Sequence, residues 1–159
     1  ITHELQALVI CGHANGKISS YDFKNHKLVH QVQANTSIQS LCFLNNCLHI
    51  VAGLTDGSMK LYESSGQMNL ISIVENAHQP KYGEAVNSIS CLMNSEQSTR
   101  SNSNLPFFVS CGADSTLKIF EHNLYQMKKG ENELLVTKTD NFKLIHKYYS
   151  SHSWGFGVL

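Results

Sequence analysis

Three segments of the chain align with one another without gaps, and this repeat restricts the fold more than any other feature of the sequence. They read VICGHANGKISSYD at 9–22, IVAGLTDGSMKLYE at 50–63 and FVSCGADSTLKIFE at 108–121. Each has an apolar stretch, a turn, a small residue and an alternating run that ends in an aromatic residue and an acid. Self-similarity of this kind predicts an architecture built from repeated supersecondary units.

Each segment has the pattern of a β-hairpin. The turns are centred on Asn15, Asp56 and Asp114, and a small residue follows each of them (Gly16, Gly57 and Ser115). Asn-Gly and Asp-Gly are preferred where both turn residues need positive φ, so we expect tight hairpin turns of that kind. The run after the turn alternates, as in Met59 and Leu61 against Lys60 and Tyr62, which predicts a strand with two distinct faces.

The spacing of the turns indicates the size of the repeat. Asn15 and Asp56 are 41 residues apart, which fits a propeller blade of about 40–45 residues. Asp56 and Asp114 are 58 residues apart, and the polar stretch NSEQSTRSNSN at 94–104 accounts for the excess as an inserted loop.

With these features in place, the units resemble WD40 repeats, in which a Gly-His precedes the first strand and a Trp-Asp closes the third. The Trp is replaced by Tyr21, Tyr62 and Phe120, and the Asp survives only at Asp22. His78 and His152 fall where the leading His belongs, and Asn35 takes that place in the unit between them. The resemblance covers about residues 7–159 and implies an all-β fold of four-stranded propeller blades.

The resemblance also implies a division of residues 1–159 into units. The first covers 7–33, the second 38–75, the third 86–148 with insertions at 94–106 and 122–141, and a further unit begins at 152–159. The expected strands are 7–12, 17–22, 27–33, 38–44, 48–53, 58–63, 69–75, 86–92, 107–111, 116–121 and 142–148. An extra strand at 133–137 is an alternative for part of the second insertion. About three blades result, fewer than the 4–8 of a closed ring. Because the first residue is Ile1, we expect a segment of a larger, seven-bladed propeller whose other blades come from the rest of the chain or from a partner.

Composition excludes some classes of partner. Lys plus Arg and Asp plus Glu are 12 each, so the net charge gives no electrostatic argument for nucleic acid or an anionic membrane. No apolar run is long enough to span a bilayer. Five scattered cysteines fit reduced thiols better than a disulfide framework, which indicates the cytoplasm, with the nucleus as the alternative.

One group of polar residues has the composition of a catalytic site. The resemblance implies a buried network of His78, Ser110 and Asp114 that pins a turn against the next strand, with Asp56 in the corresponding place of the preceding, incomplete unit. The same three residue types also form hydrolase triads, but the repeat itself predicts these positions and nothing indicates an oxyanion hole. The structural interpretation is therefore favoured, and no catalytic residue is expected.

The cysteine and glycine patterns do not complete a ligand site. Cys42-x4-Cys47-x-His49 lacks a second pair of zinc ligands, so buried thiols are favoured over a metal site. Gly155-x-Gly157 lacks the third glycine of a dinucleotide-binding loop. No metal and no cofactor are expected.

Because no catalytic, metal or cofactor site is expected, we expect the function to lie in a protein-binding surface. In the resembled family partners often dock on the face formed by the loops that join successive blades and the central hairpin turns. Lys81, Tyr82, Tyr149 and Trp154 are the candidates there, because aromatic and cationic residues anchor interfaces. Packing between blades is an equal alternative for Trp154. We expect a non-catalytic scaffold or adaptor in a multiprotein complex; the alternatives are a subunit of a ribonucleoprotein or trafficking assembly, or a regulatory propeller attached to a catalytic domain outside this sequence.

Overall fold

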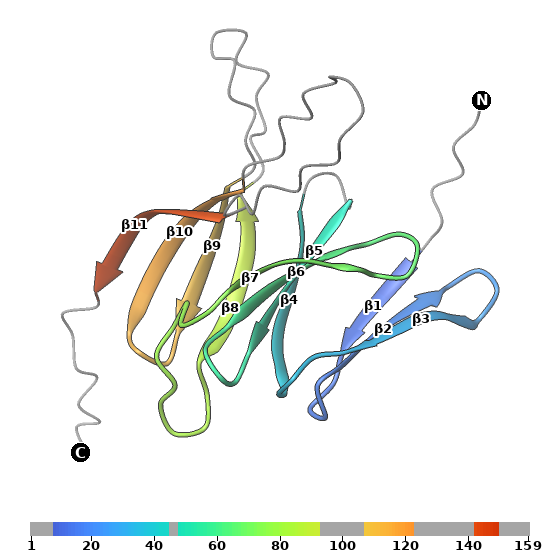
Figure 1. Ribbon diagram of the computed structural model, residues 1–159, viewed down its shortest axis with the longest axis horizontal. Coiled ribbons are helices and arrows are strands. Elements are labelled where there is room, and N and C mark those ends of the chain that lie inside the picture. Colours follow the sequence, from blue (N-terminus) through green and yellow to red (C-terminus); the bar gives the residue numbers. More distant parts are fainter. Residues whose placement is uncertain (1–7, 45–47, 93–106, 123–141, 150–159) are drawn as a thin grey trace, which may run out of the picture.

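The computed structural model describes residues 8–44, 48–92, 107–122 and 142–149. These residues form strands joined by turns and contain no helix (Figure 1). The strands are β1 (Leu8–Gly12), β2 (Lys17–Asp22), β3 (Lys27–Gln33), β4 (Ile38–Leu44), β5 (His49–Leu54), β6 (Met59–Glu63), β7 (Leu70–Val74), β8 (Val86–Leu92), β9 (Phe107–Gly112), β10 (Thr116–His122) and β11 (Phe142–Tyr149).

The strands form three separate antiparallel sheets in chain order. Their orders are β1-β2-β3, β4-β5-β6-β7 and β8-β9-β10-β11. Every strand lies within two residues of its expected position, and the predicted all-β fold of about three blades is confirmed. Within the expected insertion at 122–141 only His122 is described, as the end of β10; the insertion at 94–106, the extra strand at 133–137 and the further unit at 152–159 lie outside the described residues.

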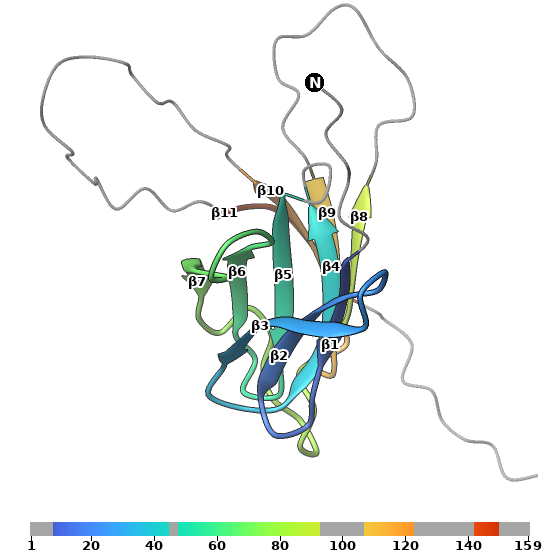
Figure 2. The ribbon, with the colours of Figure 1, turned by 90° about the vertical axis from the view of Figure 1, so that its right-hand side faces the viewer.

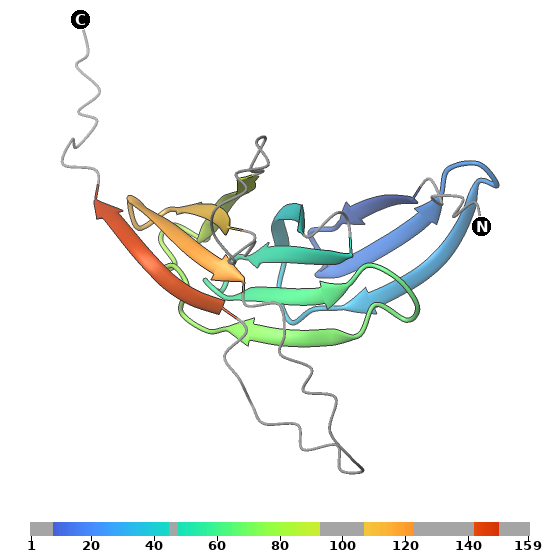
Figure 3. The same ribbon diagram turned by 90° about the horizontal axis from the view of Figure 1, so that it is seen from above.

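The sheets are arranged like the blades of a fan. Seen from above, β1, β4 and β8 lie on the concave side of the arc, and β3, β7 and β11 lie on the convex side (Figure 3). The inner strands contact one another across the blades, β1 against β4 and β4 against β8. In the side view the first sheet stands in front of the second, so neighbouring blades pack face to face (Figure 2).

The hydrophobic core lies between the blades. Between the first and second sheets it consists of Ile18, Ala34, Ile50, Ala52, Leu54, Tyr62 and Met68. Between the second and third sheets it consists of Leu44, Val51, Met59, Leu61, Ala77, Ala85, Val86, Ile89, Phe108 and Phe120. The alternation in the sequence explains this arrangement, because the second blade has a neighbour on each side and must bury both of its faces.

The central hairpin turns differ in type from the expectation. Gly16, Gly57 and Ser115 have positive φ (81°, 87° and 61°), but the Asn or Asp before each does not, so the predicted positive φ at both turn residues is wrong. In the first turn the Gly16 amide donates to His13 O, and His13 N donates to Lys17 O. A three-residue loop with a left-handed third residue explains this pattern. The side chains of Asn15, Asp56 and Asp114 each accept the amide two residues later.

Candidate functional site

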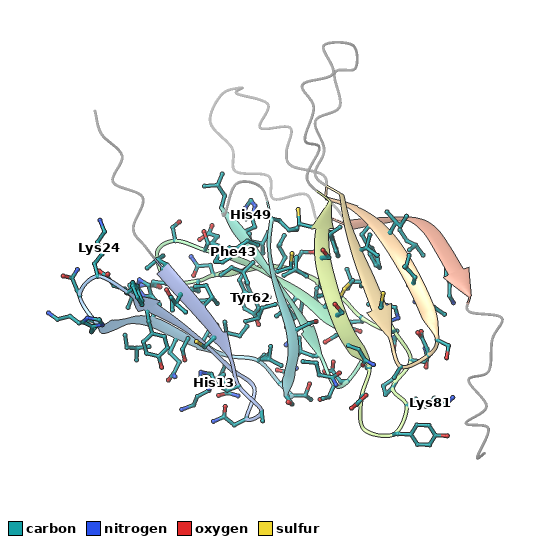
Figure 4. All side chains as sticks on the ribbon, turned by 180° about the vertical axis from the view of Figure 1, so that it is seen from behind. His13, Lys24, Phe43, His49, Tyr62 and Lys81 are labelled. Carbon is teal, nitrogen blue, oxygen red and sulfur yellow. The ribbon has the colours of Figure 1, made fainter. Side chains whose placement is uncertain are left out.

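The loop between β7 and β8, residues 75–85, projects from the end of the molecule where the central hairpin turns lie. Its tip is a two-residue turn, because Tyr82 and Gly83 both have positive φ (56° and 81°). Lys81 N donates to Glu84 O at 2.7 Å, and Glu84 N donates back to Lys81 O at 3.1 Å. The Tyr82 side chain is 94% exposed, and the Lys81 ammonium lies 5.4 Å from the centre of its ring. An aromatic side chain and a cation are thus held together in solvent, in the part of the molecule where Figure 4 labels Lys81.

The base of the loop is buried between the second and third blades. Ala77, His78 and Ala85 are each at most 3% exposed. His78 N donates to Gly57 O in the second blade at 3.0 Å, and Ala85 N donates to the Gln39 side chain at 2.8 Å. The loop tip is therefore presented from a fixed base that both blades hold.

The His78 imidazole connects this base to the third blade. Its Nδ1 lies 2.9 Å from Asp114 Oδ1, and its Nε2 lies 2.7 Å from Ser110 Oγ. If Nδ1 carries the proton, it donates to the carboxylate, and Nε2 accepts from the serine hydroxyl. Gln79 N also donates to Asp114 Oδ2 at 3.2 Å. The structure thus brings His78, Ser110 and Asp114 together, whereas Asp56 lies in the turn of the second blade.

Burial and hydrogen bonding shift the titration of this network. Burial lowers the pKa of His78, against the opposing effect of the Asp114 carboxylate. Burial would raise the pKa of Asp114, but hydrogen bonds from Thr116 and His78 outweigh it and hold that pKa well below its usual range. A neutral imidazole and an ionised carboxylate result near pH 7.

The network has the connectivity of a hydrolase triad but not the access that one needs. His78 and Ser110 are both 0% exposed, and Ser110 lies in the middle of β9, paired with Ile89 and Lys118. A nucleophile must reach a substrate carbonyl beside an oxyanion-binding donor pair. In this arrangement the serine hydroxyl is hydrogen-bonded to the His78 imidazole and is not available to a substrate.

Two members of the network were missed by the sequence reasoning. Thr116 Oγ1 donates to Asp114 Oδ1 at 2.7 Å and lies 3.1 Å from His78 Nδ1. Lys118 Nζ donates to Ala77 O, and both residues are buried. The repeat carries a signal for them, because Ser58 and Lys60 occupy the same places in the second unit.

A glycine beside the imidazole leaves the space that the His78 ring occupies. A Cβ at Gly112 would overlap the His78 ring, so only glycine leaves room for the histidine there. Gly57 is restricted in a similar way, since a Cβ there would overlap His78 O.

The second blade has the carboxylate but not the histidine. Asp56 Oδ1 accepts from Ser58 N at 2.9 Å and from Ser58 Oγ at 2.6 Å. Burial would raise the pKa of Asp56, but these hydrogen bonds lower it. Asn35, the residue expected in the place of the histidine, is exposed and lines a polar cavity together with Asp56.

The other candidate residues are less fully described. β11 pairs Tyr149 with Thr116, so the Tyr149 backbone lies beside the Asp114 turn, while its side chain is outside the described part. Trp154 and Cys47 lie outside the described residues. Among residues that are described, no three His, Cys, Asp or Glu side chains are grouped to hold a metal ion, and no helix is long and apolar enough to cross a membrane.

Comparison with known proteins identifies the family. The model of the LRRK2 β-propeller family matches residues 1–138, most of the chain. The chain belongs to this family. Its repeats are those of a WD40-type propeller, as the sequence predicted.

Individual relatives share the fold but are much longer. The chain is 28% identical over 120 residues to a striatin homologue from Dictyostelium discoideum, which is 75% of this chain and 13% of that protein. Crystal structures of Sqt1 from Chaetomium thermophilum are similar over 91% of the chain and 34% of Sqt1, with a TM-score of 0.65 and 19% identity. Another Sqt1 structure, with the same TM-score and 32% of its chain covered, contains the N-terminus of the ribosomal protein L10. The chain thus spans a small part of each.

Proposed function

We propose that this propeller segment is a non-catalytic scaffold that binds other proteins through the face carrying loop 75–85. The observation that carries the proposal is the exposed Lys81–Tyr82 tip on a base that two blades and the His78 network hold in place. A rigid aromatic side chain costs little conformational entropy on binding, and aromatic and cationic residues dominate the energy of many interfaces. The buried serine and histidine support the non-catalytic assignment.

A second candidate is a role within a ribonucleoprotein assembly. The observation that favours it is the complex of Sqt1, a propeller of similar fold, with the N-terminus of a ribosomal protein. Protein contacts would carry this role too, because the balanced charge of the chain gives no net electrostatic attraction for RNA. We also propose a cytoplasmic location, with the nucleus as the alternative, and the free thiols of Cys11, Cys42, Cys91 and Cys111 support this proposal.

The test compares two matched double variants of the full-length protein that contains this chain. Lys81→Ala with Tyr82→Ala removes the loop tip, while Phe23→Ala with Lys24→Ala removes an aromatic–cation pair at the opposite end of β2 from the hairpin turns. Proteins recovered with the wild type after affinity purification are quantified for each variant. We expect the first variant to lose at least one partner by about tenfold and the control to retain it. Equal recovery with both variants would contradict the proposed face.

A further inference from the structure

Two cysteine side chains face each other across the junction between the second and third blades. Cys42 in β4 is paired with Val51 and packs against the core cluster at this junction. Cys91 in β8 is paired with Phe108 and packs against the same cluster. Because directly opposed side chains lie on the same face of a sheet, Cys42 points toward the third blade and Cys91 points toward the second.

The strands that carry the two cysteines are in direct contact. β4 and β8 are the innermost strands of their sheets and lie on the concave side of the arc (Figure 3). Ser40 lies two residues before Cys42, on the same face of β4, and its Oγ donates to Val86 O of β8 at 3.2 Å. A side chain of β4 therefore reaches the main chain of β8 close to Cys42.

The titration of Cys42 shows that Cys91 is its neighbour. Burial raises the pKa of the Cys42 thiol most, the charge of Cys91 raises it further, and a hydrogen bond from the Cys91 main chain lowers it. Such a hydrogen bond requires close approach, so the Cys42 sulfur lies beside Cys91. Burial also raises the pKa of Cys91, and both thiols are therefore mainly protonated near pH 7.

The two thiols are accessible to small molecules but not fully exposed. Cys42 and Cys91 are both partly buried. Cys11 lies in the first sheet, Cys111 is exposed in β9, and neither core cluster includes them. Among the four cysteines in the described part of the chain, Cys42 and Cys91 are thus the pair that one junction brings together.

We propose that Cys42 and Cys91 form a redox modification site, which hydrogen peroxide converts into a disulfide that joins the second and third blades. Disulfides of cytoplasmic proteins are usually transient and respond to oxidants. A peroxide molecule is small enough to reach two partly buried thiols. The protonated thiols react slowly, so the pair stays reduced until peroxide accumulates.

The reaction transfers two electrons from the thiols to the peroxide. One thiolate attacks a peroxide oxygen, so that an S–O bond forms, the O–O bond breaks, and the departing hydroxide takes up the thiol proton as water. The product is a sulfenic acid. The other thiolate then attacks the sulfenic sulfur, the S–S bond forms, and the oxygen leaves as hydroxide that takes up the second thiol proton. Two thiols and one peroxide give one disulfide and two waters.

The disulfide adds a covalent bond to a junction that otherwise depends on packing. Cys42 and Cys91 are 49 residues apart, and a bond that closes a loop of this length restricts the unfolded chain. The second and third blades also hold the base of loop 75–85, so oxidation prevents the supports of that loop from separating. Two molecules of a thiol such as glutathione reverse the bond by exchange and leave as their own disulfide.

Peptide mass spectrometry on the full-length protein tests the bond directly. The reduced protein is exposed to increasing hydrogen peroxide, its remaining thiols are alkylated, and trypsin, which cuts after Lys60 and Lys81, places the two cysteines on separate peptides. We expect most of the Cys91 peptide to become joined to the Cys42 peptide, and dithiothreitol to separate them. Oxidised protein in which the Cys91 peptide stays unlinked would overturn the proposal.

Two matched variants identify the sulfur that Cys91 joins. Cys42 and Cys47 lie on the same tryptic peptide, so each is replaced by serine in turn. Cys47→Ser should retain the link to the Cys91 peptide, and Cys42→Ser should lose it. The opposite pattern would show that Cys47 is the partner of Cys91 and would overturn the proposal, as would a bond between Cys42 and Cys47.

Thermal unfolding shows whether the bond fits the folded junction. The unfolding temperature of the wild type should rise by about 5–10 °C on oxidation, because the cross-link restricts the unfolded chain. Cys91→Ser should unfold at the same temperature with and without peroxide, and the control Cys111→Ser should gain as much as the wild type. An unchanged or lower unfolding temperature of the linked wild type would mean that the bond forms only in distorted protein, against the proposal.

Discussion

At the scale of single residues, repeat position and burial do not always go together. Tyr21, Tyr62 and Phe120 occupy the same place in three units. Tyr62 and Phe120 are each 3% exposed, whereas Tyr21 is 36% exposed. The difference arises because Tyr62 and Phe120 pack into the cores between blades, while Tyr21 belongs to the first sheet and to neither core cluster. Hydrophobic burial thus depends on the neighbouring blade as well as on the repeat.

The His78 network makes a prediction about pH. Because burial lowers the pKa of His78, the unfolded chain binds the proton more readily than the folded one below about pH 6.5. The contribution of His78 to stability is therefore fully present above that pH and is lost as the pH falls toward the lowered pKa. Asp114, whose pKa is also lowered, adds a further loss below its ordinary value of 3.8.

The measurement is the free energy of unfolding of the wild type and of His78→Gln between pH 7.5 and 5. We expect the wild type to be more stable by about 2 kcal/mol at pH 7.5, since the variant leaves buried polar groups imperfectly paired. The gap should narrow as the pH falls. A gap that widens with acidification would mean that the folded state prefers a protonated His78.

At the scale of elements, the central turns and the loops between blades are fitted to one another. The Gly57 turn of the second blade lies under the main chain of His78 at the base of loop 75–85. The left-handed φ of Gly57 and the close approach of His78 O both exclude a side chain there. The hairpin turn is therefore part of the base that holds the candidate binding loop.

Gly57→Ala tests this close approach, with Gly66→Ala as a matched control. Both glycines have positive φ, but a Cβ at Gly66 would meet nothing within 4 Å. The control should cost about 1 kcal/mol for the left-handed backbone alone. Gly57→Ala should cost about 3 kcal/mol, because the overlap with His78 is added. Chemical denaturation gives both values, and equal costs would show that the loop base moves aside freely.

At the scale of the whole molecule, stability comes from packing between blades rather than from within them. Each sheet is one layer thick, and the core residues fall into two clusters, one at each junction between sheets. Phe108 and Phe120 are a cross-strand pair of β9 and β10 in the third sheet, stack at 5.2 Å, and belong to the cluster at the second junction. The blades therefore support one another, as expected for a repeat architecture whose units contact their neighbours.

Phe108→Ala should weaken the junction of the second and third blades strongly. Phe108 is fully buried, and loss of a buried phenylalanine costs about 3–5 kcal/mol. Phe23→Ala, at a residue that is 64% exposed, should change stability by no more than about 0.5 kcal/mol. Thermal unfolding of both variants measures the difference. A small effect of Phe108→Ala would indicate that the blades unfold independently.

The sequence alone determined the fold class and the strands, because these depend on local patterns repeated in register, and its resemblance to WD40 repeats implied His78, Ser110 and Asp114 as members of the network. Alternation gives strands, Asp-Gly gives turns, and the repeat supplies the position of each. The tertiary structure decided what depends on two blades at once. It placed Thr116 and Lys118 beside His78 and buried Tyr62 but not Tyr21. The physical reason is that burial and hydrogen bonding at a junction are set by the neighbouring blade, whose distance and side chains no single repeat encodes.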